Sequence, residues 1–173
     1  MMLESDLVKR IIALERRLAE IEAREKPGSV MALYYSNAGQ TVANNTTVTI
    51  DYNTKAIDTH SAVTTGSSWK FTAPVTGYYY IHAAIVYSPT TAWGVGDVGD
   101  LKLYKNGTFI LTLDRKDFVN SSSANVYLFL LGNIVINLNA NDYIYVTTYQ
   151  SSGSSLTIYS SWLDLNRIAI IKI

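Results

Sequence analysis

The chain has 173 residues and a formal net charge of zero, with 14 basic and 14 acidic side chains. This balance argues against a nucleic-acid binder, whose electrostatic footprint is basic, and the absence of cysteine excludes disulfides, thiol catalysis and Cys-ligated zinc. No apolar run approaches the roughly 20 residues of a membrane span, and the charged residues 1–6 do not resemble a leader, so we expect neither membrane insertion nor the usual export route.

The first 26 residues predict a parallel coiled coil. Their apolar residues recur at spacings of four and three, which is the heptad period of about 3.5 residues: Leu7, Ile11, Leu14, Leu18 and Ile21. In this register Arg10 and Arg17 at position g face Glu15 and Glu22 at position e of a neighbouring chain. The repeated Arg-apolar-x-x-apolar-Glu pattern resembles short trimeric coiled coils, although the seam alone does not select an oligomer order. The alternative is one amphipathic helix packed on its own domain, which does not need complementary e and g charges.

Residues 27–30 form a predicted linker, because Pro27 disfavours helical geometry in the residue before it and Gly28 permits a turn. Residues 31–173 are β-type, rich in Tyr, Val, Ile and Thr. Asn106 and Gly107 predict a two-residue hairpin turn. The apolar runs predict about ten strands, at 30–35, 47–52, 69–72, 77–88, 100–105, 108–118, 125–138, 142–149, 155–160 and 164–173. Short strands without intervening helices predict a mainly β fold, an antiparallel sandwich or jelly roll.

Two of these strands, 125–138 and 164–173, are apolar on both faces. A strand of an antiparallel sandwich ordinarily alternates, with one face in the core and one towards solvent. We therefore expect neighbouring subunits to cover the second face, and a dense core within one chain is the alternative.

The run FTAPVTGYYY, from Phe71 to Tyr80, resembles the signature of C1q-like domains, and the Lys105-Asn106-Gly107 hairpin resembles another element of that family. The resemblance covers roughly residues 31–173 and is specific in the Phe71–Tyr80 run. It implies a ten-stranded jelly roll of the C1q and tumour-necrosis-factor type, assembled as a trimer, which would make the coiled coil three-stranded. Animal members usually carry a secretory leader and a collagen-like stalk. A short heptad stalk is more similar to a bacteriophage or bacterial appendage protein.

The residues of the β part do not indicate an enzyme. The chain has two histidines: His60 lies in a polar loop, and His82 lies in strand 77–88, where we expect it to be packed and locally satisfied. Neither has a second histidine or a carboxylate at ligand spacing, and no nucleophile, phosphate-loop, dinucleotide or zincin motif is present. We expect no catalytic residues and no cofactor, with calcium as the one exception considered.

The loop 93–100 is the candidate ligand site. Asp97 and Asp100, together with backbone carbonyls, have the oxygen ligands from which a calcium site is built. An ordinary Gly-rich turn with solvated carboxylates is the alternative. Trp93 with Tyr87 is a candidate surface for stacking on sugar rings, although Trp93 packed beneath the loop would also account for the sequence.

These observations predict a non-enzymatic trimeric fibre or decoration protein of a virion, most simply of a bacteriophage. Its expected partners are two further copies of itself, a capsid or tail protein, and a glycan or other cell-surface ligand bound multivalently. Its expected location is the virion surface or the extracellular space. Two alternatives remain: a purely structural capsid or tail component, and a secreted C1q-like recognition or signalling ligand.

Overall fold

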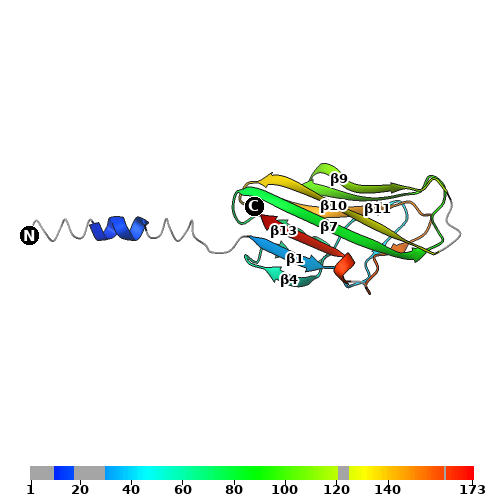
Figure 1. The fold of residues 1–173 in the computed structure, drawn as a ribbon, viewed down its shortest axis with the longest axis horizontal. Helices are drawn as coiled ribbons and strands as arrows, with labels where there is room; N and C mark the ends of the chain where they lie inside the picture. The colour runs from blue at the N-terminus through cyan, green and yellow to red at the C-terminus, as the bar shows by residue number, and fades with distance from the viewer. Residues whose placement is uncertain (1–9, 18–29, 121–124, 162) are drawn as a thin grey trace, which may run out of the picture.

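The computed structural model describes residues 10–17, 30–120, 125–161 and 163–173 (Figure 1). Residues 10–17 form a helix in which every residue is exposed. This helix contains five of the predicted coiled-coil positions, namely Arg10, Ile11, Leu14, Glu15 and Arg17. The other four, Leu7, Leu18, Ile21 and Glu22, lie outside the described residues, as do residues 27–29 of the predicted linker. In the described part of the chain, no helix is long and apolar enough to cross a membrane.

The other described residues form thirteen strands and one 3-10 helix. In chain order these are β1 (Met31–Tyr35), β2 (Thr41–Val42), β3 (Thr46–Thr49), β4 (Thr54–Asp58), β5 (Val63–Thr64), β6 (Lys70–Thr72), β7 (Gly77–Thr90), β8 (Val98–Lys105), β9 (Thr108–Asp117), β10 (Val126–Leu138), β11 (Tyr143–Gln150), β12 (Leu156–Thr157), η1 (Leu163–Leu165) and β13 (Arg167–Lys172).

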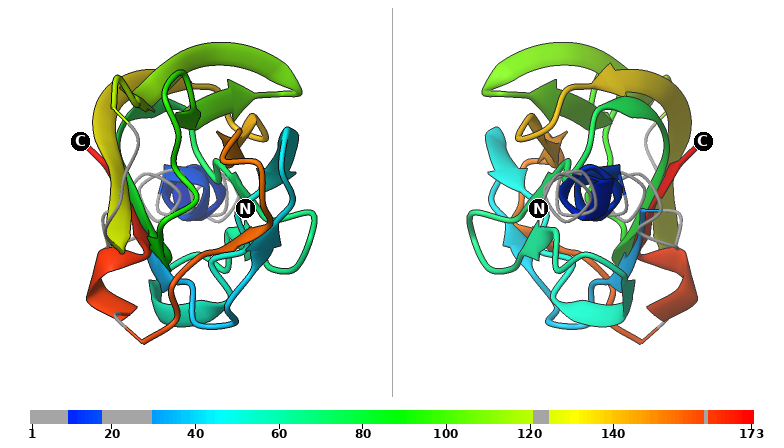
Figure 2. Two further views of the ribbon diagram at one scale, coloured as in Figure 1. Left: turned by 90° about the vertical axis from the view of Figure 1, so that its right-hand side faces the viewer. Right: turned by 90° about the vertical axis from the view of Figure 1, so that its left-hand side faces the viewer.

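The strands form two main sheets that pack face to face (Figure 2). The first sheet has five strands in the order β10-β7-β13-β1-β4. The second has six, in the order β5-β6-β11-β8-β9 with β3 also paired to β11, and β12 and β2 form a small separate pair. Every strand pairing among the described residues is antiparallel. The arrangement is a β-sandwich consistent with the expected jelly roll.

The predicted count of ten strands is not confirmed, because β2, β4 and β5 were not expected. Strands β2 and β5 have two residues each, which is too short for a period-two pattern to show. Strand β4 lies at the edge of the first sheet and is largely exposed, so its TKAID sequence lacks buried alternation. The predicted strand 164–173 begins instead with η1, and 155–160 contains only the short β12.

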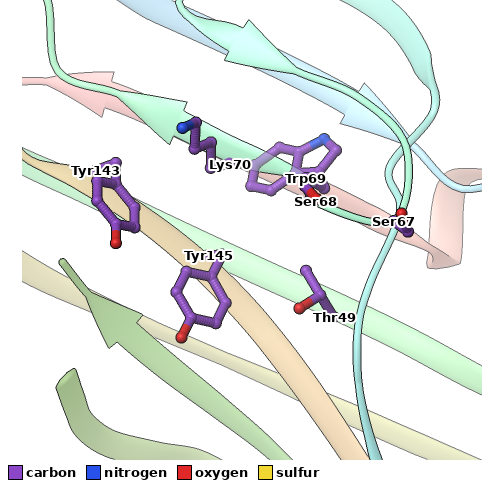
Figure 3. A pocket seen from close by; sticks show the side chains of 7 residues that line it. All are labelled: Thr49, Ser67, Ser68, Trp69, Lys70, Tyr143 and Tyr145. Atoms are coloured by element: carbon purple, nitrogen blue, oxygen red, sulfur yellow. The ribbon is translucent and has the colours of Figure 1, made fainter. Parts of the chain in front are cut away.

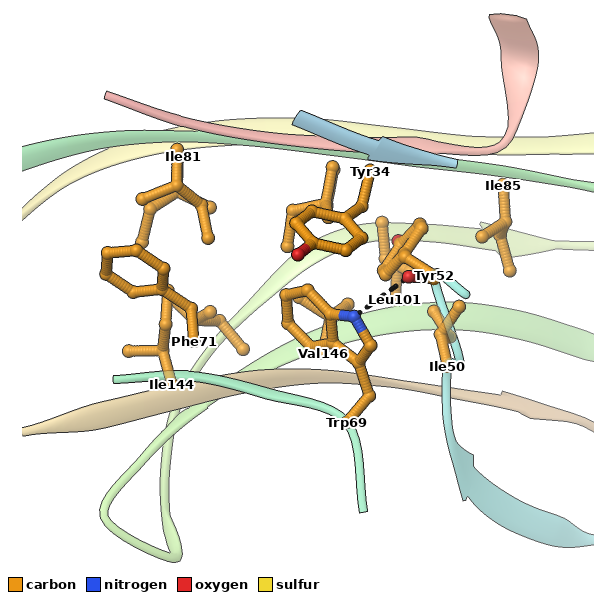
Figure 4. Packing of buried hydrophobic residues seen from close by; sticks show 14 of the residues in the cluster. Tyr34, Ile50, Tyr52, Trp69, Phe71, Ile81, Ile85, Leu101, Ile144 and Val146 are labelled. Carbon is orange, nitrogen blue, oxygen red and sulfur yellow. Dashed lines mark hydrogen bonds between the residues drawn. The ribbon is translucent and has the colours of Figure 1, made fainter. Parts of the chain in front are cut away.

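Large aromatic side chains fill the space between the two sheets (Figure 4). Trp69 is 1% exposed, and its indole Nε1 donates a 3.1 Å hydrogen bond to the carbonyl oxygen of Tyr52. The Trp69 ring meets those of Tyr52 and Tyr34 edge-on, at centroid distances of 5.4 and 6.4 Å. Phe71 of β6, in the second sheet, meets Tyr79 of β7, in the first sheet, in the same edge-on manner. Trp69 therefore contributes a large buried apolar surface to the core, and its indole N–H has a hydrogen-bond partner there.

The predicted hairpin turn between β8 and β9 is confirmed. Asn106 and Gly107 both have positive φ angles, 50° and 81°, as a type I′ turn requires. The Asn106 side chain donates a 2.7 Å hydrogen bond to Asp142, and Lys105 Nζ lies 2.8 Å from the same carboxylate. Hydrogen bonds from Lys105, then Asn106, then the Asn139 amide lower the pKa of Asp142 to about 2. This carboxylate therefore links the β8–β9 turn to the β10–β11 turn.

Gly132 allows β10 to pass close to β9. A Cβ added at Gly132 would lie 2.5 Å from the carbonyl oxygen of Leu113 in β9, so one of the two strands would have to move. We predict that Gly132→Ala lowers the free energy of unfolding by about 1–3 kcal/mol. Ser155→Ala, an exposed substitution between β11 and β12, is the control and should change it by less than about 0.5 kcal/mol. Urea unfolding at one protein concentration measures both; equal midpoints for the two variants would contradict the prediction.

Candidate functional site

The two aromatic residues predicted to stack on sugars are buried, so that prediction is wrong. Tyr87 is 0% and Trp93 is 1% exposed. The Trp93 ring stacks on Phe118 at 4.5 Å and meets Tyr87 edge-on at 6.3 Å. The Tyr87 hydroxyl lies 2.8 Å from Thr148 Oγ1 inside the sandwich, and burial raises the pKa of Tyr87 above its usual range. The alternative expectation, that Trp93 packs beneath its loop, is confirmed.

The two carboxylates of the same segment each have a local partner. Asp97 Oδ2 accepts a 2.6 Å hydrogen bond from the Gly94 amide and closes the turn before β8. Asp100 is 2% exposed, and its Oδ2 lies 2.6 Å from Lys102 Nζ. Among the described residues, no three His, Asp or Glu side chains gather closely enough to hold a metal ion. The Gly-rich turn explains Asp97, whereas the expectation of a solvated carboxylate is wrong for Asp100, which is a buried ion-pair partner.

The outer face of the first sheet carries exposed apolar side chains. Alternation along β7, β10 and β13 turns one set of side chains into the core and leaves the other outside. The outward set remains apolar: Leu131 is 53%, Val135 50% and Phe129 41% exposed. We call this surface, together with its continuation over β13, β1 and β4, the outer apolar face. Its further members are Tyr78, Tyr80, Ala84, Ala169, Ile171, Leu33 and Ile57.

Sequence reasoning found only part of this face. The two-faced patterns of strands 125–138 and 164–173 correspond to β10 and β13, and both do carry apolar residues on both sides. The contributions of Leu33 and Ile57 were missed. They are paired across β1 and β4, and β4 was not predicted.

His82 lies on the outer apolar face, on the side of β7 shared with Tyr80 and Ala84, where it is half-buried and not packed in the core as expected. It lines a hollow of about 210 Å³ with Leu131 and Arg167 among the other residues. Partial burial, and then the nearby Arg167 guanidinium, lower the pKa of His82 below its usual value. The site is therefore suited to a neutral imidazole covered by apolar surface. His60, by contrast, contacts Thr59 Oγ1 at 2.8 Å in a loop.

Solved structures that resemble this fold include a tumour-necrosis-factor protein, a complement domain and APRIL. Eiger TNF from S. frugiperda matches with a TM-score of 0.59 and 14% identity over 84% of this chain and 92% of that chain. The globular domain of zebrafish complement 1qA matches with a TM-score of 0.53 and 16% identity over 84% and 98%. Murine APRIL matches with a TM-score of 0.54 and 12% identity over 84% and 100%. No family model and no curated relative matches the sequence. At these identities the likeness concerns the fold, and it confirms that the β domain is a jelly roll of the TNF and C1q type.

The environment of His82 predicts a stability that depends on pH. Because its pKa is lowered, the native state binds the proton less readily than the unfolded chain, whose histidine titrates near 6.5. The free energy of unfolding should therefore fall as the pH drops below about 6.5, and His82→Gln should reduce this fall. Tyr80→Phe, on the same face of β7, should keep it. Unfolding midpoints measured between about pH 7.5 and 5.5 test this prediction. If the midpoint of His82→Gln falls with pH as steeply as that of the wild type, His82 does not cause the pH dependence.

Proposed function

We propose that the chain is a non-enzymatic, trimeric fibre or decoration protein of a virion, whose β domains bind a host or environmental surface together. The observation that carries this proposal is the outer apolar face. A single chain leaves Leu131, Val135 and Phe129 about half exposed on one sheet. Covering side chains of this kind stabilises an assembly by up to about 1.5–3 kcal/mol each.

Trimeric order is supported by a sequence resemblance and by a surface of the β domain. The resemblance of the Phe71–Tyr80 run to C1q-like domains implies a trimer, and the TNF and C1q type of fold agrees with that resemblance. The outer apolar face supplies the self-complementary surface that such an assembly needs. A closed ring of three copies would place the first sheets at the centre and leave the second sheets exposed.

The N-terminal helix supports the same proposal. Ile11 is 46% and Leu14 is 63% exposed, so neither predicted seam residue is buried by its own chain. This favours contacts between chains over a single helix packed on its domain. In the proposed trimer, Arg10 and Arg17 would face the glutamates of neighbouring chains and fix the parallel register.

One specific observation favours a second candidate. The structural likeness to Eiger TNF and to complement 1qA is compatible with a secreted recognition or signalling ligand. This candidate would also be a trimer with a binding head. It would be secreted by a cell, whereas the first candidate would be part of a virion. Genes neighbouring this one that encode capsid or tail components would favour the virion protein.

Assembly is tested by removing the two proposed contacts separately and together. In the full chain, Leu131→Lys places a charge in the outer apolar face, and Arg10→Glu with Arg17→Glu places like charges in the predicted coil. We expect light scattering to give three times the 19.2 kDa chain mass for the wild type and a single chain mass for the combined variant. Each change alone should raise the concentration at which the trimer dissociates.

The matched control is Val95→Lys, which adds the same charge at a 71% exposed valine outside the outer apolar face. It should leave the trimer intact. Adding Glu15→Arg and Glu22→Arg to the stalk variant should restore stability by re-forming opposite charge pairs. A wild-type chain that is monomeric at micromolar concentration would refute the proposal.

Binding is tested with the wild type and the combined monomeric variant on the same surfaces. Both are labelled and applied to bacterial cells and to a glycan array. Three linked sites dissociate more slowly than one, so we expect the trimer to be retained about 100-fold more strongly than the monomer. Equal retention would exclude the multivalent mechanism. No retention of the trimer on any cell or glycan would favour a purely structural role in the particle.

A further inference from the structure

The outer face of the second sheet carries a hollow that the proposed trimer would leave open to solvent. Its volume is about 290 Å³, and it lies over β11 and the start of β6 (Figure 3). Tyr143 and Tyr145 form one wall, and Ser67, Ser68, Lys70 and Thr49 complete the rim, with the buried Trp69 behind. A hollow of this volume is at the small end of ligand sites and fits about one sugar ring.

The tyrosines of this hollow form an ordered stack. The ring of Tyr145 lies 5.0 Å from that of Tyr104 with an interplanar angle of 9°, and 6.4 Å from that of Tyr143 at 18°. Tyr143 and Tyr145 alternate with the buried Ile144 and Val146, so the strand itself directs both rings outward. Rings held in this manner lose little conformational freedom when a ligand binds.

The hydroxyl groups around the hollow are available to a ligand. Within the described part of the chain, the phenol hydroxyls of Tyr143, Tyr145 and Tyr104 make no hydrogen bond to another protein group. The hydroxyls of Ser67, Ser68 and Thr49 stand at the same rim. Each can donate or accept, which matches the mixed donor and acceptor pattern of sugar hydroxyls.

Lys70 gives the hollow its charge. Its ammonium lies 5.2 Å from the centre of the Tyr143 ring and, among the described residues, has no carboxylate partner. Other lysines of the second sheet are neutralised, Lys102 by Asp100 at 2.6 Å and Lys105 by Asp142 at 2.8 Å. An uncompensated cation beside aromatic rings and hydroxyls favours a ligand that brings its own negative charge.

We propose that this hollow binds an acidic sugar residue, a pyranose bearing a carboxylate. The apolar C–H face of the sugar would lie against the tyrosine wall, its hydroxyls would bond to the rim, and its carboxylate would pair with Lys70. The inference deepens the proposed function, because it assumes a binding head, and it assigns the ligand contact to the second sheet. Three copies would present three such hollows around one axis, which suits a repetitive acidic polysaccharide.

The full-length wild type is tested by calorimetry with oligomers of galacturonate, mannuronate and glucuronate, and with neutral oligogalactose as the matched probe. We expect one acidic oligomer to bind and the neutral one to bind at least about tenfold more weakly. Lys70→Gln should remove the difference, and Tyr145→Ala should remove binding to both. Binding of the neutral oligomer as tightly as the acidic ones, or no binding of any acidic oligomer, would overturn the proposal.

Controls separate loss of the site from loss of the fold. Arg115→Gln removes an equal charge from the exposed strand β9, outside the hollow, and should bind like the wild type. Tyr145→Phe keeps the ring and should lose only part of the affinity. Each variant must retain the wild-type assembly mass and far-ultraviolet spectrum. Competition by inorganic phosphate as effective as that by the acidic oligomer would assign the hollow to small anions and overturn the sugar assignment.

The same variants distinguish this inference from the proposed function. If Lys70→Gln trimers still adhere to cells like the wild type, the hollow is not the contact, while the adhesive function stands. If the wild type binds an acidic oligomer but adheres to no cell or particle, the hollow stands and the adhesive function fails.

Discussion

The structure depends on one constraint: the first sheet carries apolar side chains on both of its faces. The core of the sandwich covers its inner face, where Trp69 and Tyr52 pack beneath β1 and β7. Nothing in the single chain covers Leu131 and Val135 on the outer side among the described residues. Exposed apolar side chains gathered on one sheet face are typical of an interaction surface. The proposed trimer is the arrangement in which this sheet is buried on both sides.

The two outer faces of the sandwich therefore differ in chemistry and in proposed use. The first sheet presents aliphatic residues around a histidine whose pKa is lowered, which suits burial. The second presents tyrosines, threonines and lysines, with Lys102 and Lys105 already paired to carboxylates. A surface of that kind stays hydrated and still has ring faces and hydroxyl groups for a ligand. The proposed assembly on one sheet and the proposed recognition on the other would therefore not compete.

Local patterns predicted what depends on local physics. The long strands, the Asn106–Gly107 turn and the two-faced character of β10 and β13 follow from alternation and turn preference within a few residues. The burial of Trp93 does not follow from such local patterns, because the ring that covers it, Phe118, lies 25 residues further along the chain. Asp100 was misread although its partner is local, because alternation within β8 places Lys102, two residues further on, on the same face. The hollow lined by Tyr143, Tyr145 and Lys70 was missed because its walls come from β6 and β11, which are far apart in sequence.

The order of the elements also links the predicted stalk to the outer apolar face. The coil is predicted to end at residue 26, and β1 begins at Met31 within the first sheet, next to β13. The intervening residues 27–30 reach at most about 14 Å when extended. A three-stranded coil on the symmetry axis must therefore lie close to the start of β1 in all three copies. Because β1 belongs to the first sheet, this proximity would favour the proposed arrangement, in which the first sheets lie near the axis and Leu131 and Val135 are buried.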